Sequence, residues 1–522
     1  MRKRWISALI VAALALGLWG TIVGSNVNRP EKKIVSTKSK PGGALLAKAA
    51  NSEETEETGS FTFTENLAGS KLAQEILKPE LPENKVYSPL TLGMAMAMLA
   101  DAATGETRQE ILDAMGWASM EDLDKMVKVA YGSVNQKKDE GESSIANALW
   151  LREDMKFREE KISELAGSSY ADVFSGKMGS EDYDKLHQDW LNEKTGGLLK
   201  EAVKNRKFKE TLGICLSSAS YYRQLWPEKM TLLENRLFLG GAYGNTRVDM
   251  LSASQKLDYY RGEHYSSVGL PLKNGTIFWL FLPDMEYNVS EILKDDTYLS
   301  VMKGDVEPVE EKADVELCFP RMDCMTDIDA KKAICELGYL RAFDNRADFS
   351  ELTEYDLFVR TIPHATRICV DEYGITAAAY AEAELDEGAL MLDDRIYFIC
   401  NRPFFYAVAD SEGMVYYEGV MKTGEEIPDD EVKIRRPIVQ VNGKIYQKTD
   451  ELATVTCGVA DGRILYAEAA DKGLTEDNIS NFGEGYPYQY SDEGHLSVNI
   501  DGTWYVFEYV PDISTIYYKP KG

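Results

Sequence analysis

Residues 372–394 read E-Y-G-I-T-A-A-A-Y-A-E-A-E-L-D-E-G-A-L-M-L-D-D, the most informative stretch of the chain. From its fourth position, every second residue is apolar: Ile375, Ala377, Ala379, Ala381, Ala383 and Leu385. The interleaved residues are mostly polar: Thr376, Ala378, Tyr380, Glu382, Glu384 and Asp386. A period of two predicts a half-buried strand, whereas the content of Ala and Glu favours a surface helix. A segment with the pattern of a strand and the propensity of a helix can have two states.

Upstream of this stretch, the chain predicts helices. Ser88-Pro89 predicts a helix start, with Ser as the N-cap and Pro as the first helical residue. The following residues, 90–103, are small and apolar on every face, which indicates a buried helix. Thr107-x-x-Glu110 is interpreted as a capping box that begins the next helix.

Strands dominate the later part of the chain. Residues 276–282 form a short apolar run that ends at Pro283, which predicts a core strand. Residues 395–408 and 414–420 predict two strands joined by the turn 410–413. Helices early and strands late, without regular alternation, predict an α+β fold.

The composition changes at both ends of the chain. Residues 1–24 are a basic start followed by an uncharged apolar run from residue 5 to residue 24, which predicts either a cleaved export signal or a retained membrane anchor. Residues 25–60 are predicted to be a flexible linker, and 61–424 the main folded domain. Residues 425–522 are rich in Tyr, Gly and Asp and predict a separate small all-β domain.

The charge and the cysteines narrow the class of protein. The chain has 522 residues, with 86 acidic and 58 basic side chains and a net charge of −28. This excess of acid argues against a nucleic-acid partner, because phosphate binding needs clustered Lys and Arg. Seven cysteines form no C-x-x-C pair, so we interpret them as isolated, mostly buried thiols.

The sequence offers little catalytic chemistry. It has four histidines and contains no H-E-x-x-H, no G-x-S-x-G and no Walker A motif. A lone histidine such as His364 is more often structural than a base or a ligand. No metal site and no cofactor are therefore expected, and an enzyme is the less favoured class.

Several motifs in order along 61–424 resemble the serpin family of serine protease inhibitors. The early ones are N-K-V-Y-S-P-L-T-L (84–92), D-A-A-T-G-E-T-R-Q-E-I-L (101–112), I-A-N-A-L-W (145–150) and Trp226 at the end of a strand. The late ones are L-G-Y-L-R-A-F (337–343), A-D-F-S-E-L (347–352), His364, V-D-E-Y-G-I-T-A-A-A (370–379) and N-R-P-F-F-Y (401–406). The resemblance implies the serpin fold: early helices, a large central sheet and an exposed reactive loop.

The resemblance also implies a function, that of a suicide-substrate protease inhibitor rather than an enzyme. A protease attacks the reactive loop, and the cleaved loop inserts as an extra strand into the central sheet. On the alternation above, Ile375 through Leu385 would face the core after insertion. The hinge and inserting strand would comprise Glu372, Gly374, Ile375, Thr376, Ala377, Ala378, Ala379, Ala381 and Ala383.

The match to the family has departures at two places. The hinge residue after Gly374 is Ile375, where inhibitory members usually have Thr or Ser. The region that opens the sheet would contain Ser88, Thr91, Ser218 and His364, with Ser218 where the family usually has Asn. A non-inhibitory serpin that is cleaved without trapping therefore stays an alternative.

The position of the scissile bond stays open within 385–392. Counting forward from Glu372 by the family spacing places it at Gly388-Ala389, whereas counting back from Pro403 places it near Met391-Leu392. The remaining candidates are Leu385 and Leu390. No Lys or Arg lies between Glu372 and Asp394, which disfavours trypsin-like targets.

The expected partner is a serine protease of the elastase, subtilisin or chymotrypsin type, with a papain-like cysteine protease as the alternative. Six carboxylates in the loop predict salt-sensitive association with basic protease clefts. A monomer outside the cytoplasm is expected, either secreted or anchored by residues 5–24. The tail resembles a small β-rich module found at the ends of exported Gram-positive bacterial proteins.

Overall fold

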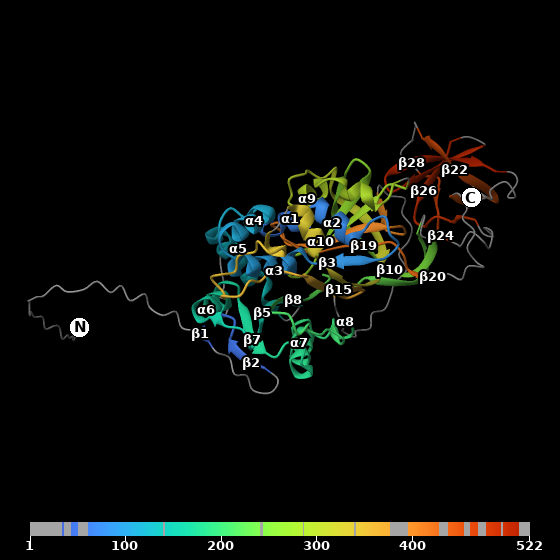
Figure 1. Cartoon of the computed structure of the whole chain (residues 1–522). Helices are drawn as coiled ribbons and strands as arrows, with labels where there is room; N and C mark the ends of the chain where they lie inside the picture. Colours follow the sequence, from blue (N-terminus) through green and yellow to red (C-terminus); the bar gives the residue numbers. More distant parts are fainter. Residues whose placement is uncertain are drawn as a thin grey trace, which may run out of the picture.

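The computed structural model describes residues 34–35, 43–50, 61–138, 141–240, 244–285, 287–338, 341–375, 395–426, 437–453, 460–467, 477–491 and 494–510. These residues form one eight-stranded sheet, one ten-stranded sheet and a second eight-stranded sheet near the C-terminus, with helices beside the first two (Figure 1). The predicted α+β class is confirmed. No helix of these ranges is long and apolar enough to cross a membrane, and residues 5–24 lie outside them.

The first eight-stranded sheet contains the hinge motif around Gly374. Its strand order is β14-β15-β16-β8-β5-β7-β2, with β4 paired to β5. The bounds are β14 Met322–Asp329, β15 Pro363–Asp371, β16 Gly374–Ile375, β8 Ile214–Leu225, β5 Gly141–Arg152, β7 Ala171–Gly176, β2 Ala44–Ala47 and β4 Gln136–Lys138.

The ten-stranded sheet follows the order β17-β13-β10-β11-β12-β18-β19-β3, with β9 and β20 paired to β10. The bounds are β17 Ile396–Ile399, β13 Glu310–Pro320, β10 Asn245–Arg261, β11 Tyr265–Pro271, β12 Ile277–Pro283, β18 Phe404–Ala409, β19 Val415–Met421, β3 Lys85–Tyr87, β9 Thr231–Leu239 and β20 Glu425–Glu426. The predicted core strand is β12, and the predicted late hairpin is β18–β19.

The C-terminal sheet, here called the C-terminal module (438–509), has the order β23-β26-β27-β28-β22-β21-β25-β24. The bounds are β23 Gly462–Arg463, β26 Pro487–Tyr490, β27 His495–Ile500, β28 Thr503–Tyr509, β22 Lys444–Leu452, β21 Ile438–Val441, β25 Ile479–Ser480 and β24 Tyr466–Ala467. The prediction of an extra β-rich region at the C-terminus is confirmed. Residues 425–426 pair with β10, so the start of the predicted tail belongs to the ten-stranded sheet.

The helices gather on the side of the molecule away from the C-terminal module (Figure 1). Their bounds are α1 Phe61–Ala68, α2 Ser70–Leu77, α3 Pro89–Ala102, α4 Gly105–Met115, α5 Met120–Val134, α6 Glu159–Ser168, α7 Glu181–Lys194, α8 Lys200–Val203, α9 Thr297–Met302 and α10 Lys331–Leu337, with 3-10 turns η2 Val289–Lys294 and η3 Arg341–Phe343. The helix α3 packs against β8, and α7 packs on β5 and β8 through a separate aromatic cluster around Trp150.

The two predicted helix starts had different outcomes. Ser88 caps α3 as predicted, since its Oγ accepts the Thr91 N–H at 3.1 Å. The capping box at Thr107 is wrong, because α4 begins at Gly105 and its N-cap is Thr104, three residues before Thr107. The Thr107 hydroxyl instead accepts the Asp348 N–H at 2.9 Å, a tertiary contact that local sequence cannot reveal.

Part of the predicted linker joins the fold. The strand β2 pairs with β7 at the edge of the first sheet, and the two-residue strand β1 (Ile34–Val35) pairs with β6 (Phe157–Arg158). A flexible linker therefore does not describe these residues. The paired residues are two short apolar runs inside a mainly polar stretch, so the composition of 25–60 as a whole did not reveal the edge pairing.

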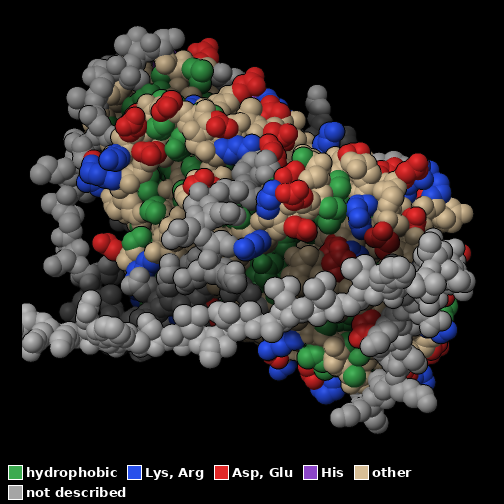
Figure 2. Space-filling model, turned by 90° about the vertical axis from the view of Figure 1, so that its left-hand side faces the viewer, with side chains coloured by type: hydrophobic (Ala, Val, Ile, Leu, Met, Phe, Trp, Pro, Cys, Tyr) green, Lys and Arg blue, Asp and Glu red, His purple; other side chains and the backbone are tan. Residues whose placement is uncertain are grey.

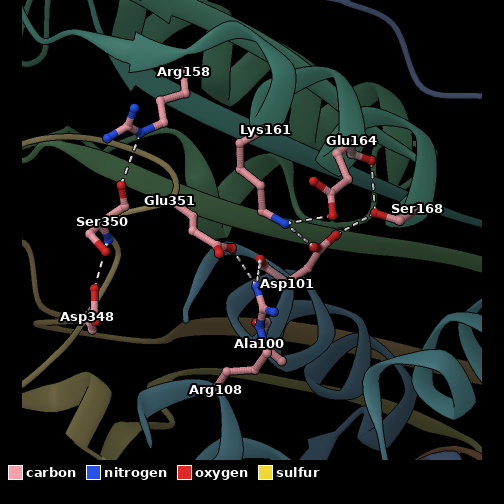
Figure 3. Close-up of polar contacts among 10 residues, drawn as sticks. All are labelled: Ala100, Asp101, Arg108, Arg158, Lys161, Glu164, Ser168, Asp348, Ser350 and Glu351. Atoms are coloured by element: carbon pink, nitrogen blue, oxygen red, sulfur yellow. Dashed lines mark hydrogen bonds and ion pairs between the residues drawn. The ribbon is translucent and has the colours of Figure 1, made fainter. Parts of the chain in front are cut away.

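A buried polar network ties α3 to its neighbours (Figure 3). The Asp101 carboxylate at the end of α3 pairs with Lys161 Nζ of α6 at 2.7 Å, and both side chains are almost fully buried. Arg108 of α4 donates to the Ala100 carbonyl at 3.1 Å and pairs with Glu351 at 3.2 Å. These contacts fix the C-terminal end of α3, the helix that packs against β8 of the first sheet.

The net negative charge is not segregated on the visible surface. On the face shown in Figure 2, Lys and Arg side chains lie among the Asp and Glu side chains, with hydrophobic side chains between them. The described residues of this face form no continuous basic track of the kind that nucleic-acid binding requires.

Candidate functional site

The hinge motif forms a tight turn that starts a new strand. After β15 the chain reverses, and the Asp371 carboxylate accepts the N–H groups of Tyr373 and Gly374 at 2.9 and 3.1 Å. The indole of Trp226 donates to the Asp371 carbonyl at 2.9 Å, and the Trp226 N–H donates to the Tyr373 carbonyl at 3.0 Å. The chain therefore enters the sheet at a defined point.

Gly374 is required at this point by close packing. It pairs with Asp371 of β15 and Leu225 of β8, and a Cβ at this position would lie 2.1 Å from the Gln224 carbonyl oxygen. Any side chain would collide with backbone that cannot move without breaking the ladder. Glycine thus permits the two-sided pairing that begins β16.

Ile375 is the first residue whose side chain occupies the gap between the strands. It pairs with Val370 and Gln224 and is fully buried in the main core. Threonine or serine at this place would put a hydroxyl into the same apolar surroundings. The departure from the family pattern therefore increases the apolar burial of the hinge.

Beyond Ile375, β8 and β15 have no partner on their facing edges among the described residues. Both strands run antiparallel to β16 and so parallel to each other, and no ladder joins them directly. We call this space the slot; it runs from Ile375 to Ile214 and Pro363. A sheet with unpaired backbone groups on two facing edges is a template for one more strand.

A cavity of about 430 Å³ opens at the lower end of the slot. Its floor is formed by α3 through Leu92, Met96 and Leu99, and its sides include Leu216 and Ile362. A second, smaller space lies higher in the slot beside Ser220 and Thr366. The apolar lining suits side chains that arrive on the core face of an added strand.

Three of the four predicted sheet-opening residues form one hydrogen-bonded group under the slot. The Ser88 N–H donates to His364 Nε2 at 3.1 Å, and Thr91 both donates its N–H to Ser88 Oγ and contacts the Ser88 carbonyl. Ser218 does not join them: its buried hydroxyl has no hydrogen-bond partner within the described part of the chain. The group is therefore held by α3 and β15 without a side-chain bond from β8.

His364 is neutral in this arrangement. Its burial, and secondly the positive charge of Arg206, lower the pKa of the imidazole to about 3. A neutral ring leaves Nε2 free to accept, as the bond from Ser88 requires. His187 on α7 has the same pKa shift for the same reasons, and its Nε2 contacts Ser217 Oγ of β8 at 3.1 Å.

Some site residues were not predicted. Thr366 Oγ1 contacts His364 Nε2 at 2.8 Å, and Ser220 Oγ contacts the Tyr417 hydroxyl at 2.8 Å. Thr366 lies two residues after His364 and so shares its face of the strand, a period-two signal that could have revealed it. Ser220 and Tyr417 are far apart in the sequence, and no local signal joins them.

The other predicted residues fall outside the described ranges. These are the remainder of the inserting strand and all the scissile-bond candidates: Thr376, Ala377, Ala378, Ala379, Ala381, Ala383, Leu385, Gly388, Ala389, Leu390, Met391 and Leu392. Glu372 lies in the turn before β16, where its carbonyl accepts the Met230 N–H at 2.9 Å.

Known proteins share this architecture. The chain is 23% identical over 367 residues to an uncharacterized serpin-like protein of Methanosarcina acetivorans, covering 66% of this chain and 82% of that protein. It is 25% identical over 328 residues to alpha-1-antitrypsin 1-4 of Mus musculus, covering 59% of this chain and 76% of that protein. The crystal structure of the thermophilic serpin tengpin in the native state superposes with a TM-score of 0.62 at 23% identity, covering 73% of this chain and all of that one.

The family assignment follows from the match to a family model over more than half of the chain. The family model described as serpin (serine protease inhibitor) matches residues 64–421, which include the hinge and the strands β8 and β15 on either side of the slot. Members of this family inhibit proteases and are generally not catalysts themselves. The chain belongs to the serpin family.

Proposed function

We propose that this protein traps a serine protease outside the cytoplasm, through cleavage of segment 376–394 and insertion of its first part into the slot. The observation that carries the proposal is the start of the inserted strand: Gly374 and Ile375 already pair with both β15 and β8. Below them, the facing edges of the two strands have no ladder in the described ranges. The residues that directly follow Ile375 can therefore reach the slot and pair with its two edges as an added strand.

The register of β16 supports a match in length between segment and slot. Ile375 lies opposite Gln224, so each further residue would move one position down β8. Counting in this way, Leu385 falls opposite Ile214, the first residue of β8. The alternating stretch from Ile375 to Leu385 therefore spans the strand from end to end.

The register also supports the side-chain pattern. In β8 and β15 the even-numbered residues, such as Tyr222 and Ile368, belong to the main core, whereas Ala219 packs on the cluster beneath α7. A strand continuing from Ile375 would turn its odd-numbered residues to the main core. These are the apolar residues, and all between Ile375 and Leu385 are alanine, which suits a narrow slot.

The target class follows from the charges of the segment. It contains no Lys or Arg, so a trypsin-like protease has no basic residue to bind. Leu, Ala, Gly and Met at 385–392 suit elastase-, subtilisin- or chymotrypsin-like serine proteases, with a papain-like cysteine protease as a further target. The proposed location rests on residues 5–24, as a cleaved signal or an anchor.

The test is a mixture of the chain, without residues 1–24, and one protease of each class. Trapping predicts a covalent complex that survives SDS with an elastase- or subtilisin-like enzyme and none with a trypsin-like enzyme. Mass spectrometry of the released peptide locates the bond within 385–392. Cleavage without a complex and without a rise in melting temperature would contradict the proposal and favour a non-inhibitory binding role.

A further inference from the structure

The strand β17, which follows segment 376–394, is an edge strand that is nevertheless buried. Among the described residues it pairs with β13 alone, through four residue pairs from Val315–Ile396 to Cys318–Ile399. Tyr397, Phe398 and Ile399 are each less than 10% exposed. A four-residue parallel ladder at a sheet edge is weak by itself, so other contacts must provide this burial.

The C-terminal module covers β17. The guanidinium of Arg463 lies 3.7 Å from the centre of the Tyr397 ring. The backbone at Gly485 approaches β17 so closely that a Cβ there would lie 2.8 Å from Ile399 Cδ1. Beside them, Glu484 pairs with Arg236 of β9 at 3.3 Å.

The residues directly after β17 are also held by the module. Asn401 Nδ2 donates to the Phe482 carbonyl at 2.9 Å. Arg402 forms a buried ion pair with Asp501 at 2.5 Å, with side-chain exposures of 9% and 3%, and it donates to the Pro283 carbonyl as well. The module therefore contacts the strand along its side and at its end.

While segment 376–394 is uncut, the number of residues between the slot and β17 limits how far the segment can insert. With Leu385 at the base of β8, eleven residues lead to Ile396 and reach at most about 36–40 Å. The return along β8 to the top of the slot is about 33 Å. There β13 leads into β14 through Arg321 alone, so β13 continues beyond the slot, for about 16 Å from Pro320 to Val315, beside Ile396. Full insertion of the uncut segment thus requires β17 to leave β13.

We propose that the C-terminal module is a clamp that keeps β17 in the sheet and so prevents the uncut segment from filling the slot. This inference rests on the proposed insertion of 376–385. After cleavage the two parts of the segment separate, so the clamp does not oppose insertion. The module would thereby keep the inhibitor in the state with an unfilled slot until a protease cleaves segment 376–394.

The test compares full-length variants in the uncut state. The clamp variants are the double substitution Arg463→Ala with Glu484→Ala and, separately, Asp501→Asn, which keeps the size of the side chain. Each is incubated a few degrees below its melting temperature. The fraction with intact mass, raised thermal stability and lost inhibition is measured with time, together with amide exchange at residues 396–399.

The control is Lys444→Ala, which removes a contact with Tyr509 inside the module, 5.5 Å from its ring centre, and leaves β17 untouched. The clamp predicts conversion about tenfold faster or more in both clamp variants, with faster exchange in β17, and wild-type behaviour in the control. Conversion at the wild-type rate in both variants, while cleaved protein still gains stability, overturns the clamp alone. If cleaved wild-type protein gains no stability, insertion itself fails and both proposals are overturned.

Discussion

The two ends of segment 376–394 are held in different ways. At its N-terminal end, Gly374 and Ile375 lie between two strands whose facing edges continue without a partner in the described ranges. At its C-terminal end, β17 has a partner strand on one side and the C-terminal module around it. One end can extend its pairing and the other cannot move without losing contacts. Because of this difference, segment 376–394 can insert into the sheet from its N-terminal end, whereas its C-terminal end stays attached to β17.

The largest effect at the N-terminal end of the segment is expected from a charged residue on the core face of the proposed inserted strand, because it should prevent insertion. Ala377→Asp would place a carboxylate opposite Tyr222 and Ile368 in the main core, where an unpaired charge is very costly. We expect loss of the SDS-resistant complex and of the stability gain after cleavage. Gel analysis and thermal denaturation of the cleaved protein measure both.

The matched control lies one residue further along. Ala378→Asp would fall on the other face, opposite Tyr221 and near Arg367, which is partly exposed. We expect it to retain most of the inhibition. Equal loss in both variants would mean that the register extrapolated from β16 is wrong.

The next largest effect concerns the hinge. Gly374→Ala places a Cβ against the Gln224 carbonyl, so β16 should leave the sheet and expose Ile375. Losing the burial of one isoleucine costs about 1.5–3 kcal/mol, measured as a lower free energy of unfolding. Gly167→Ala in α6, where a Cβ meets nothing within 4 Å, is the control and should be neutral or stabilising.

The slot end should also respond to pH, whereas the clamp has no comparable histidine among the residues argued to form it. The pKa of His364 is lowered in the folded protein to about 3, so its stabilising effect is complete above pH 6.5 and declines as pH falls towards 3. We expect the free energy of unfolding to fall by at most about 1.4 kcal/mol per pH unit from this group. Denaturation at a series of pH values between 7 and 5 measures the slope.

His364→Gln separates titration from hydrogen bonding, since the amide oxygen can accept the Ser88 N–H but does not titrate. The variant should show a shallower decline below pH 6.5. An unchanged slope in His364→Gln would remove this histidine from the pH response.

The smallest expected effect is at the departure from the family pattern. Ile375→Thr replaces a buried ethyl group by a hydroxyl in an apolar environment, which should lower the stability of the uncut protein by about 1–2 kcal/mol. Inhibition should persist, because threonine is also a good strand residue. Loss of inhibition in this variant would show that the apolar side chain is needed for insertion itself.

Local patterns were sufficient for much of the fold. Ser88-Pro89 predicted the start of α3, and the apolar run before Pro283 predicted β12. Order and spacing of longer motifs predicted the family. Local reasoning failed at Thr107, whose hydroxyl accepts the Asp348 N–H rather than capping its own helix. It also failed at the short apolar run 44–47, whose partner strand β7 lies far along the chain.

By itself, the sequence determined the alternation from Ile375 to Leu385, the glycine before it and the absence of basic residues up to Asp394. Only the tertiary structure decided that Ile375 lies between β15 and β8, that the Ser218 hydroxyl has no hydrogen bond to His364, and that the C-terminal module contacts β17. Periodicity is a property of neighbouring residues and can be read along the chain. Contacts such as the ion pair of Arg402 with Asp501 join residues that are far apart in the sequence. The free energy lost by desolvating the two charges and the free energy gained by pairing them depend on burial, which no local pattern records.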